Sequence, residues 1–163
     1  MGERGFACIG LYRPKTAENV GAVLRAAHCY RAAQVNIEGG RNNYMRHATN
    51  TTMAHRHTPT FLVDDVLAYV PFGTQIVAVD LIPGAVPLPS FTHPERAIYL
   101  FGPEDGTLGR RHTDRAHHVV YVPTRDCMNL AAAVNVVLYD RMVKRGRVAD
   151  PLVKTAIKRR AVA

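Results

Sequence analysis

Apolar residues gather along the chain into short runs, separated by polar stretches rich in proline or glycine. Six runs have the length expected of buried strands: residues 6–11, 34–38, 61–63, 74–80, 97–101 and 119–122. Most of them are apolar runs rather than strict alternations, as expected for a parallel sheet that is covered on both faces. Two longer stretches, residues 16–30 and 129–144, carry apolar side chains at helical spacing. The pattern therefore predicts an α/β domain with a mostly parallel sheet and helices on both faces.

The two predicted helices begin and end at residues that suit those positions. Thr16 can cap the first helix, and Glu18 lies in its first turn, where the helix dipole favours an anion. Asp126 or Asn129 can cap the second helix, and Gly146 can terminate it.

Other segments predict shorter or irregular elements. Residues 64–69 favour a short helix, and so do residues 45–54 within a polar and basic segment. Residues 81–94 hold four prolines, which predict a loop. Asp150 and Pro151 suit the cap and the first position of a further helix near the end of the chain.

Length and composition limit the class of protein. The chain has 163 residues, of which 47% are hydrophobic, enough for one sizeable core. We expect a single domain over residues 1–146 and a basic tail or short helix over residues 147–163. The apolar runs are much shorter than the ~20 residues of a membrane helix, and no secretory signal is recognisable. Three cysteines form no disulfide framework, so we expect a reduced, cytoplasmic protein.

The net charge of +8 is concentrated near the end of the chain, since residues 144–163 carry seven basic side chains and one acid. A net positive charge alone is compatible with either nucleic-acid binding or a role in solubility. Its concentration near the end of the chain favours nucleic-acid binding. Five residues are candidates for contacts with an RNA backbone: Arg41, Arg46, Arg56, Lys144 and Arg145. No cysteine or carboxylate stands at metal-ligand spacing from the histidine pairs, so we expect no metal.

Three stretches carry candidate chemistry: ENVGAVLRAA at residues 18–27, FGPEDGTLG at 101–109 and YVPTRDCMNL at 121–130. Each alone also fits an ordinary role, as a solvated helix, an acidic turn and a helix cap. The second and third follow predicted strands, and open α/β sheets bind ligands beyond the carboxyl ends of strands. Glu104 and Asp105 would repel a phosphate, so the second stretch suits a cationic ligand or an ordered backbone.

Taken together and in order, these stretches resemble the motifs of the SpoU/TrmH branch of the SPOUT RNA methyltransferases. The first motif of that family corresponds to Asn19, Gly21 and Arg25. The second corresponds to Gly102, Pro103, Glu104, Gly106 and Leu108, and the third to Val122, Pro123, Cys127, Met128, Asn129 and Leu130. The resemblance covers residues 6–144. Cys127 replaces the usual serine, and a thiol is a weaker hydrogen-bond partner than a hydroxyl.

The resemblance implies a SPOUT fold with a C-terminal trefoil knot whose loops hold S-adenosylmethionine. It implies these cofactor-binding residues: Phe101, Gly102, Glu104, Gly106, Val122, Pro123, Cys127, Met128 and Leu130. The implied catalytic residues are Arg25, Asn19, Glu104 and Asn129, and in such proteins Arg25 usually meets the cofactor across a homodimer. Because a neutral arginine is scarce, we expect Arg25 to clamp the RNA and stabilise the developing alkoxide rather than to act as a free base. Glu104 could orient Arg25 through a charge-assisted hydrogen bond.

The activity that the resemblance implies is methylation of an RNA ribose 2′-hydroxyl, with tRNA favoured over ribosomal RNA. Two alternatives stay open at this point. One is a knotted RNA-binding protein without catalysis, in which Cys127 marks the loss of activity. The other is a base methyltransferase of the same fold.

Overall fold

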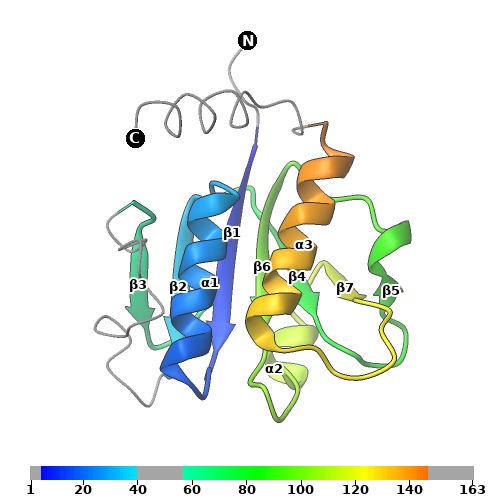
Figure 1. Cartoon of the computed structure of the whole chain (residues 1–163), viewed down its shortest axis with the longest axis horizontal. Helices are drawn as coiled ribbons and strands as arrows, with labels where there is room; N and C mark the ends of the chain where they lie inside the picture. The colour runs from blue at the N-terminus through cyan, green and yellow to red at the C-terminus, as the bar shows by residue number, and fades with distance from the viewer. Residues whose placement is uncertain (1–4, 40–56, 147–163) are drawn as a thin grey trace, which may run out of the picture.

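The computed structural model describes residues 5–39 and 57–146, which form one seven-stranded sheet with helices packed against it (Figure 1). The strands are β1 (Phe6–Tyr12), β2 (Gln34–Glu38), β3 (Thr60–Val63), β4 (Gln75–Val79), β5 (Val86–Pro87), β6 (Arg96–Phe101) and β7 (His118–Tyr121). Their order in the sheet is β3-β2-β1-β6-β4-β7-β5, and every pair is parallel. The predicted parallel α/β fold is confirmed.

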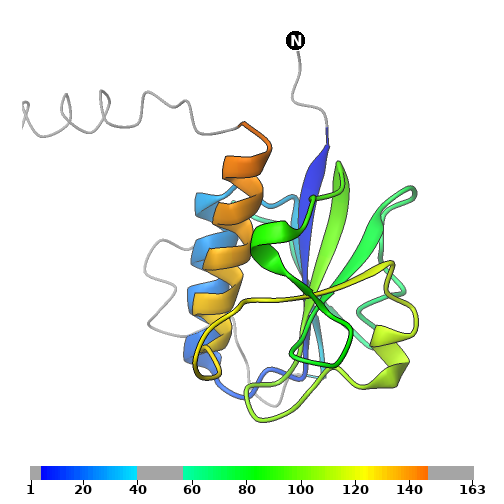
Figure 2. The ribbon, with the colours of Figure 1, turned by 90° about the vertical axis from the view of Figure 1, so that its right-hand side faces the viewer.

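One face of the sheet is covered by α1 (Ala17–Cys29) and α3 (Leu130–Lys144), which lie side by side (Figures 1 and 2). Val20 and Leu24 of α1 and Val134 and Val137 of α3 are fully buried in the larger core cluster. These four residues recur at helical spacing, so each helix presents one apolar stripe to the strands. Both helices were predicted from this spacing.

The opposite face of the sheet has a smaller core, in which Ile98 and Leu100 pack against Val66 and Leu108. The short helix α2 (Arg110–Thr113) lies in the segment that covers this face. Helical cover on both faces is thus confirmed, although that of the second face is slight.

The short helix predicted over residues 64–69 is wrong, because this segment is a turn. The segment closes as a turn, in which the Ala68 N–H donates to the Asp65 carbonyl at 3.1 Å. Side chains hold its other donors: the Val66 N–H donates to the Glu38 carboxylate at 2.8 Å, and the Leu67 N–H donates to Asp65 Oδ1 at 2.9 Å. Aspartate commonly favours such local bonds over helix formation.

The loop predicted over residues 81–94 is also partly wrong, since it contains β5 and the 3₁₀ helix η3 (Leu88–Ser90). Proline lacks the N–H that a central strand requires, but β5 lies at the edge of the sheet, where Pro87 is tolerated. Pro89 lies in the first turn of η3, where a backbone N–H would have no acceptor within the helix, so the missing N–H of proline costs no hydrogen bond.

The predicted helix caps are confirmed. Thr16 Oγ1 accepts a hydrogen bond from the Asn19 N–H at 3.3 Å. Asn129 Oδ1 accepts from the N–H groups of Ala131 and Ala132 at 2.9 and 3.3 Å. Gly146 follows α3 with φ of 67°, a conformation that glycine adopts without steric cost.

The strand order places β7 between β4 and β5, which are joined directly by residues 80–85. The Asp80 N–H donates to the Val120 carbonyl at 2.9 Å, so the connection begins against β7. The chain that leaves β7 must therefore pass this connection on its way to α3 (Figure 2). This arrangement is the one a C-terminal knot requires, and the knot itself stays a prediction.

Several predictions fall on parts of the chain outside the described residues. These are the helix over residues 45–54, the helix that begins at Asp150, the tail over residues 147–163 and the RNA contacts of Arg41, Arg46 and Arg56. Within the described residues, no helix is both long and apolar enough to span a membrane, and no cluster of side chains could hold a metal ion.

A buried arginine joins the amino-terminal edge of the sheet to α3. The Arg141 guanidinium donates to the carbonyls of Phe6, Pro94 and Glu95 at 3.0, 2.6 and 2.7 Å and to the Tyr99 hydroxyl at 3.0 Å. Arg141 is only 4% exposed, so its charge is compensated by these acceptors rather than by water.

The Tyr99 hydroxyl extends this network to His93 and Asp140. His93 Nε2 lies 2.8 Å from the Asp140 carboxylate, and His93 Nδ1 lies 2.7 Å from the Tyr99 oxygen. The carboxylate only accepts, so Nε2 carries the proton and Nδ1 accepts from the tyrosine. Burial lowers the pKa of His93 and raises the pKa of Tyr99 to about 12, which keeps both groups neutral in this arrangement.

We predict that Arg141→Met lowers the free energy of unfolding by about 3–5 kcal/mol, because it leaves several buried acceptors without a donor. Urea denaturation followed by circular dichroism measures the change. The control is Arg110→Met at an exposed position of α2, for which we expect a change within about 0.5 kcal/mol. Equal losses in the two variants would contradict the structural role of Arg141.

Candidate active site

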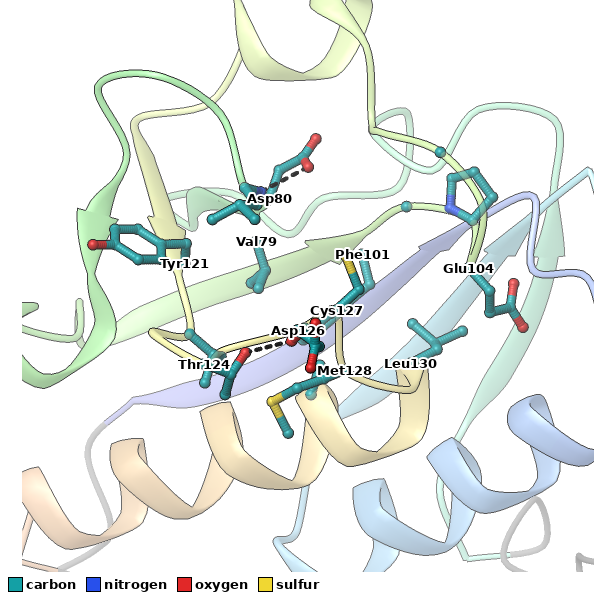
Figure 3. A pocket seen from close by; sticks show the side chains of 16 residues that line it. Val79, Asp80, Phe101, Glu104, Tyr121, Thr124, Asp126, Cys127, Met128 and Leu130 are labelled. Carbon is teal, nitrogen blue, oxygen red and sulfur yellow. Dashed lines mark hydrogen bonds between the residues drawn. The ribbon is translucent and has the colours of Figure 1, made fainter.

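A pocket opens where β4, β6 and β7 end, at the carboxyl edge of the sheet. Its wall comes from residues 79–81 after β4, residues 101–106 after β6 and residues 121–133, which lead from β7 into α3 (Figure 3). The space measures about 770 Å³, part of it open to solvent. This position is typical of a small-molecule site in an open α/β sheet.

The lining of the pocket combines apolar side chains with acids. The apolar part includes Val79, Phe101, Val122, Met128 and Leu130. Among residues 5–39 and 57–146, the lining includes the carboxylates of Asp80, Glu104 and Asp126 and no lysine, arginine or histidine. The pocket therefore offers an apolar surface for a flat ligand group and a negative potential for a cation.

A chain of hydrogen bonds joins all three sequence motifs beside this pocket. The Asn19 amide donates to Glu104 Oε1 at 2.6 Å, and the Asn129 amide donates to Asn19 Oδ1 at 2.8 Å. Asn129 also caps α3, so its side chain has its oxygen fixed by the helix and its nitrogen fixed by Asn19. The three motifs, distant along the chain, are thus held in a fixed relation.

Glu104 is stabilised as a carboxylate. Partial burial raises its pKa, but hydrogen bonds from the Asn19 side chain and from the Lys15 N–H, at 2.9 Å, outweigh burial. The net effect lowers the pKa of Glu104 from its ordinary value. A carboxylate with a lowered pKa is a weak base, so Glu104 is suited to orienting a donor rather than to taking a proton.

Asp80 fastens the pocket wall between β4 and the second motif. Its Oδ2 accepts from the Leu108 N–H at 2.8 Å, and its Oδ1 accepts from the Leu81 N–H at 2.8 Å. The backbone of Asp80 is bonded to β7 as well, through the Val120 carbonyl. One residue therefore links the three segments from which the pocket is built.

Gly102 permits the second motif to fold back on itself. A side-chain carbon at this position would meet the Leu108 nitrogen at 3.1 Å and the Thr107 carbonyl carbon at 3.2 Å. Both neighbours are backbone atoms that cannot rotate away, so a larger residue would displace the wall of the pocket. The sequence interpretation expected this glycine to admit a ligand, and the structure shows that it first admits the loop itself.

The predicted cofactor-binding residues lie together. All of them except Pro123 line the pocket. Of the predicted catalytic residues, Asn19, Glu104 and Asn129 form the hydrogen-bond chain, and Arg25 does not join them. Cys127 lines the pocket with its side chain exposed.

Arg25 lies elsewhere on α1. It follows Asn19 by six positions, which advances it about 9 Å along the helix and turns it about 240° around the axis. Arg25 is exposed, and no hydrogen bond or ion pair links it to Glu104 in the part of the chain that the structure describes. The expected orientation of Arg25 by Glu104 is therefore not found within one chain.

Lys144 and Arg145, two predicted RNA contacts, are engaged within the molecule. The Lys144 ammonium donates to the carbonyls of Leu88 and Phe91 at 2.6 and 3.1 Å and pairs with Asp140 at 2.8 Å. Arg145 contacts the His93 carbonyl at 3.5 Å. Their bonds join the end of α3 to the segment around η3.

Five residues that line the pocket and bear on its chemistry were not named as site residues from the sequence. Tyr121, Thr124 and Asp126 lie within the third stretch, whereas Val79 and Asp80 lie outside all three stretches. A signal was available for Asp80, because it ends a strand that was predicted parallel to the other two. No spacing within the sequence indicates that residues 79–81 adjoin the other motifs, since this depends on the order of strands in the sheet.

Comparison with known proteins gives one matching family. The sequence profile of the SpoU rRNA Methylase family matches residues 7–139. No match was found among curated proteins.

Several solved structures share the fold. AviRb, a SpoU methyltransferase from Streptomyces viridochromogenes, solved with AdoMet, is 19% identical with a TM-score of 0.75, over 89% of this chain and 60% of its own. The A. aeolicus TrmH/SpoU tRNA modifying enzyme is 17% identical with a TM-score of 0.77, over 89% and 78%. A structure described as giving insights into the 2-OH methylation of C/U34 on tRNA is 22% identical with a TM-score of 0.74, over 90% and 94%.

The chain spans about 60% of the length of AviRb and 58% of that of an rRNA methyltransferase from Sinorhizobium meliloti. At these identities the likeness establishes the fold, which is that of the SPOUT methyltransferases.

We predict that Asp80→Ala loosens the wall of the pocket, because it removes the acceptor of the Leu108 N–H. Amide hydrogen exchange measured by NMR should show faster exchange at Leu108, and the free energy of unfolding should fall by about 1–3 kcal/mol. Asp114→Ala, at an exposed position after α2, is the control and should leave Leu108 unchanged. Unaltered protection of Leu108 in Asp80→Ala would show that the bond does not hold the loop.

Proposed function

The chain belongs to the SpoU rRNA methylase family, and on this premise we propose that it is an S-adenosylmethionine-dependent RNA methyltransferase that modifies a ribose 2′-hydroxyl of tRNA. The observation that carries the proposal is the bond chain from Glu104 through Asn19 to Asn129 beside the pocket. It joins the three motifs on which the family resemblance rests, at the edge of the sheet where α/β proteins bind ligands.

The residues of the pocket fit S-adenosylmethionine. Phe101, Val122 and Leu130 offer an apolar surface to the adenine ring, and the backbone of the loops after β6 and β7 offers polar groups to its edge. The acids Glu104 and Asp126 suit the positive charge of the ligand. When bound, this group supplies a methyl carbon that is activated by a sulfonium.

The residues of the hydrogen-bond chain contribute by fixing the positions of the site's segments rather than by transferring a proton. The Asn129 side chain is held by α3 and by Asn19, and Asn19 is held by Glu104. The first turn of α1 and the pocket loops thus keep one relative position, which lowers the entropic cost of aligning a ribose with the pocket. Alignment of reacting groups is the main demand of an in-line displacement at an activated carbon.

Arg25 is the proposed clamp for the RNA and the stabiliser of the developing alkoxide. A guanidinium stays charged at neutral pH and donates in a planar fork that suits phosphate and oxyanions. Since Arg25 lies on the exposed side of α1, away from the pocket of its own chain, we propose that it serves the pocket of a second copy in a homodimer. In a twofold dimer, Arg25 of each chain would face the pocket of the other chain, which gives two equivalent sites.

A tRNA substrate is supported by one of the structures that share the fold. The structure concerned with tRNA C/U34 methylation matches 90% of this chain over 94% of its own length. The family description names ribosomal RNA, and the choice between the two RNAs is therefore part of the test.

We predict that tRNA from cells lacking this gene loses one ribose-methylated nucleoside, which returns when the gene is restored. Mass spectrometry of nucleosides from purified tRNA and ribosomal RNA measures the loss. Because a methylated ribose blocks alkaline cleavage at its own linkage, hydrolysis before analysis separates ribose from base methylation. Loss of a base-methylated nucleoside, or a loss confined to ribosomal RNA, would contradict the corresponding part of the proposal.

We predict that Arg25→Ala abolishes methyl transfer but leaves S-adenosylmethionine binding within about twofold of the original, since Arg25 does not line the pocket. Tritium transfer to tRNA and isothermal titration calorimetry measure the two quantities. Arg96→Ala is the control, because Arg96 is exposed at the start of β6, at the opposite end of the strand from the pocket. A nearly normal transfer rate in Arg25→Ala would remove Arg25 from the mechanism.

Mixing variants tests whether Arg25 acts on the partner. Cys127→Trp fills the pocket from an exposed loop position, so it should block binding without unfolding the chain. Arg25→Ala and Cys127→Trp are each inactive, but after exchange of subunits in equal amounts about a quarter of the original activity should return. No recovery in dimers shown to have exchanged would mean that each chain completes its own site.

A further inference from the structure

The pocket has a charge pattern that distinguishes two forms of its ligand. We propose that Asp126 is a specificity-determining residue that favours the positively charged methyl donor over the neutral thioether that remains after transfer. The inference rests on the proposed function, because it takes S-adenosylmethionine as the ligand. It adds a role for a residue that lies within the third stretch but is not one of the positions that match the family motif.

Asp126 is the acid of the pocket with the least compensation. Asp80 accepts two backbone N–H groups, and Glu104 accepts from Asn19 and Lys15. The Asp126 carboxylate, in contrast, has no hydrogen bond or ion pair among the described residues, and only its backbone carbonyl is engaged, by the Thr124 hydroxyl at 2.7 Å. Its charge is thus available to a ligand.

The place of Asp126 directs this charge to the pocket. It lies on the loop between β7 and α3, between Thr124 and Met128 in the close view, and all three residues line the space (Figure 3). The nearest cation in the sequence, Arg125, is exposed and does not belong to the lining. The Lys15 ammonium pairs with Asp105, which also stands outside the lining. Among the residues that the structure describes, no basic side chain belongs to the lining that holds these acids.

The two ligand forms differ by one charge and by little else. The donor carries a sulfonium, an ammonium and a carboxylate, so its net charge is positive. The product, S-adenosylhomocysteine, has lost the methyl group and the sulfonium charge and is neutral overall. A carboxylate near the ligand therefore attracts the donor more strongly, and the attraction falls at the moment the product forms.

The size of this preference follows from Coulomb's law. Two charges ~6–8 Å apart in a partly hydrated pocket interact strongly enough to change a dissociation constant by about threefold to tenfold. A preference of this size speeds exchange of product for donor without making the donor hard to release. Because the pocket is open to solvent, salt should reduce the preference.

Isothermal titration calorimetry with S-adenosylmethionine and S-adenosylhomocysteine tests the inference through the ratio of the two dissociation constants. In Asp126→Asn we expect donor affinity to fall about threefold to tenfold while product affinity stays within twofold. Asp126→Glu keeps the charge and should keep the ratio. Asp114→Asn makes the same charge change outside the pocket and should also keep the ratio. Circular dichroism and thermal unfolding show that each variant is folded.

The outcomes separate the inference from the proposed function. An unchanged ratio in Asp126→Asn, or an equal loss of both ligands, overturns the role of Asp126 but leaves the cofactor assignment standing. If Asp114→Asn changes the ratio of the two dissociation constants as much as Asp126→Asn does, the preference comes from the net charge of the protein. That result would likewise overturn the role of Asp126. If the unaltered protein binds neither ligand, the cofactor assignment fails, and the inference fails with it.

Discussion

The parallel direction of β4, β6 and β7 is the constraint on which the site depends. Parallel strands end at one edge of a sheet, and here three neighbouring strands deliver Asp80, the Gly102 loop and the Cys127 loop to the same pocket. The position of β7 next to β4 is essential. If β5 lay between them, residues 79–81 would be far from residues 121–130. The pocket is thus a consequence of strand order, and the individual side chains refine it.

Two polar networks hold the opposite ends of the sheet in different ways. At the amino-terminal edge, the Arg141 guanidinium is buried and takes several acceptors from the backbone, which suits a permanent structural joint. At the carboxyl edge, Asn19, Glu104 and Asn129 lie closer to the surface, and one hydrogen bond joins each neighbouring pair. Bonds nearer to water contribute less stability, so the buried network contributes more to holding the layers together, and the bonds at the carboxyl edge fix the relative position of the motifs.

Local chemistry made much of the fold predictable from the sequence. Thr16 and Asn129 act as caps through bonds to residues two or three positions away, and the apolar stripe of α3 needs only helical spacing. The failures came from long-range partners. The turn at residues 64–69 depends on Glu38, and Pro87 forms a strand only because the sheet has an edge there. Asp80 was missed for the same reason, since its role depends on Leu108.

The separation of charges in the molecule argues that one chain holds only part of the proposed machinery. Where the structure describes it, the lining of the pocket has acids and no basic side chain, whereas Arg25, the proposed clamp for RNA, is exposed on α1 and does not belong to the lining. If Arg25 entered the pocket of its own chain, it would pair with Glu104 or Asp126 and reduce their attraction for a sulfonium. In the proposed dimer the guanidinium would approach the pocket together with RNA, whose phosphate and ribose would lie between the two charges. On this proposal, the distance of Arg25 from the acids of its own chain leaves them available to a cationic ligand.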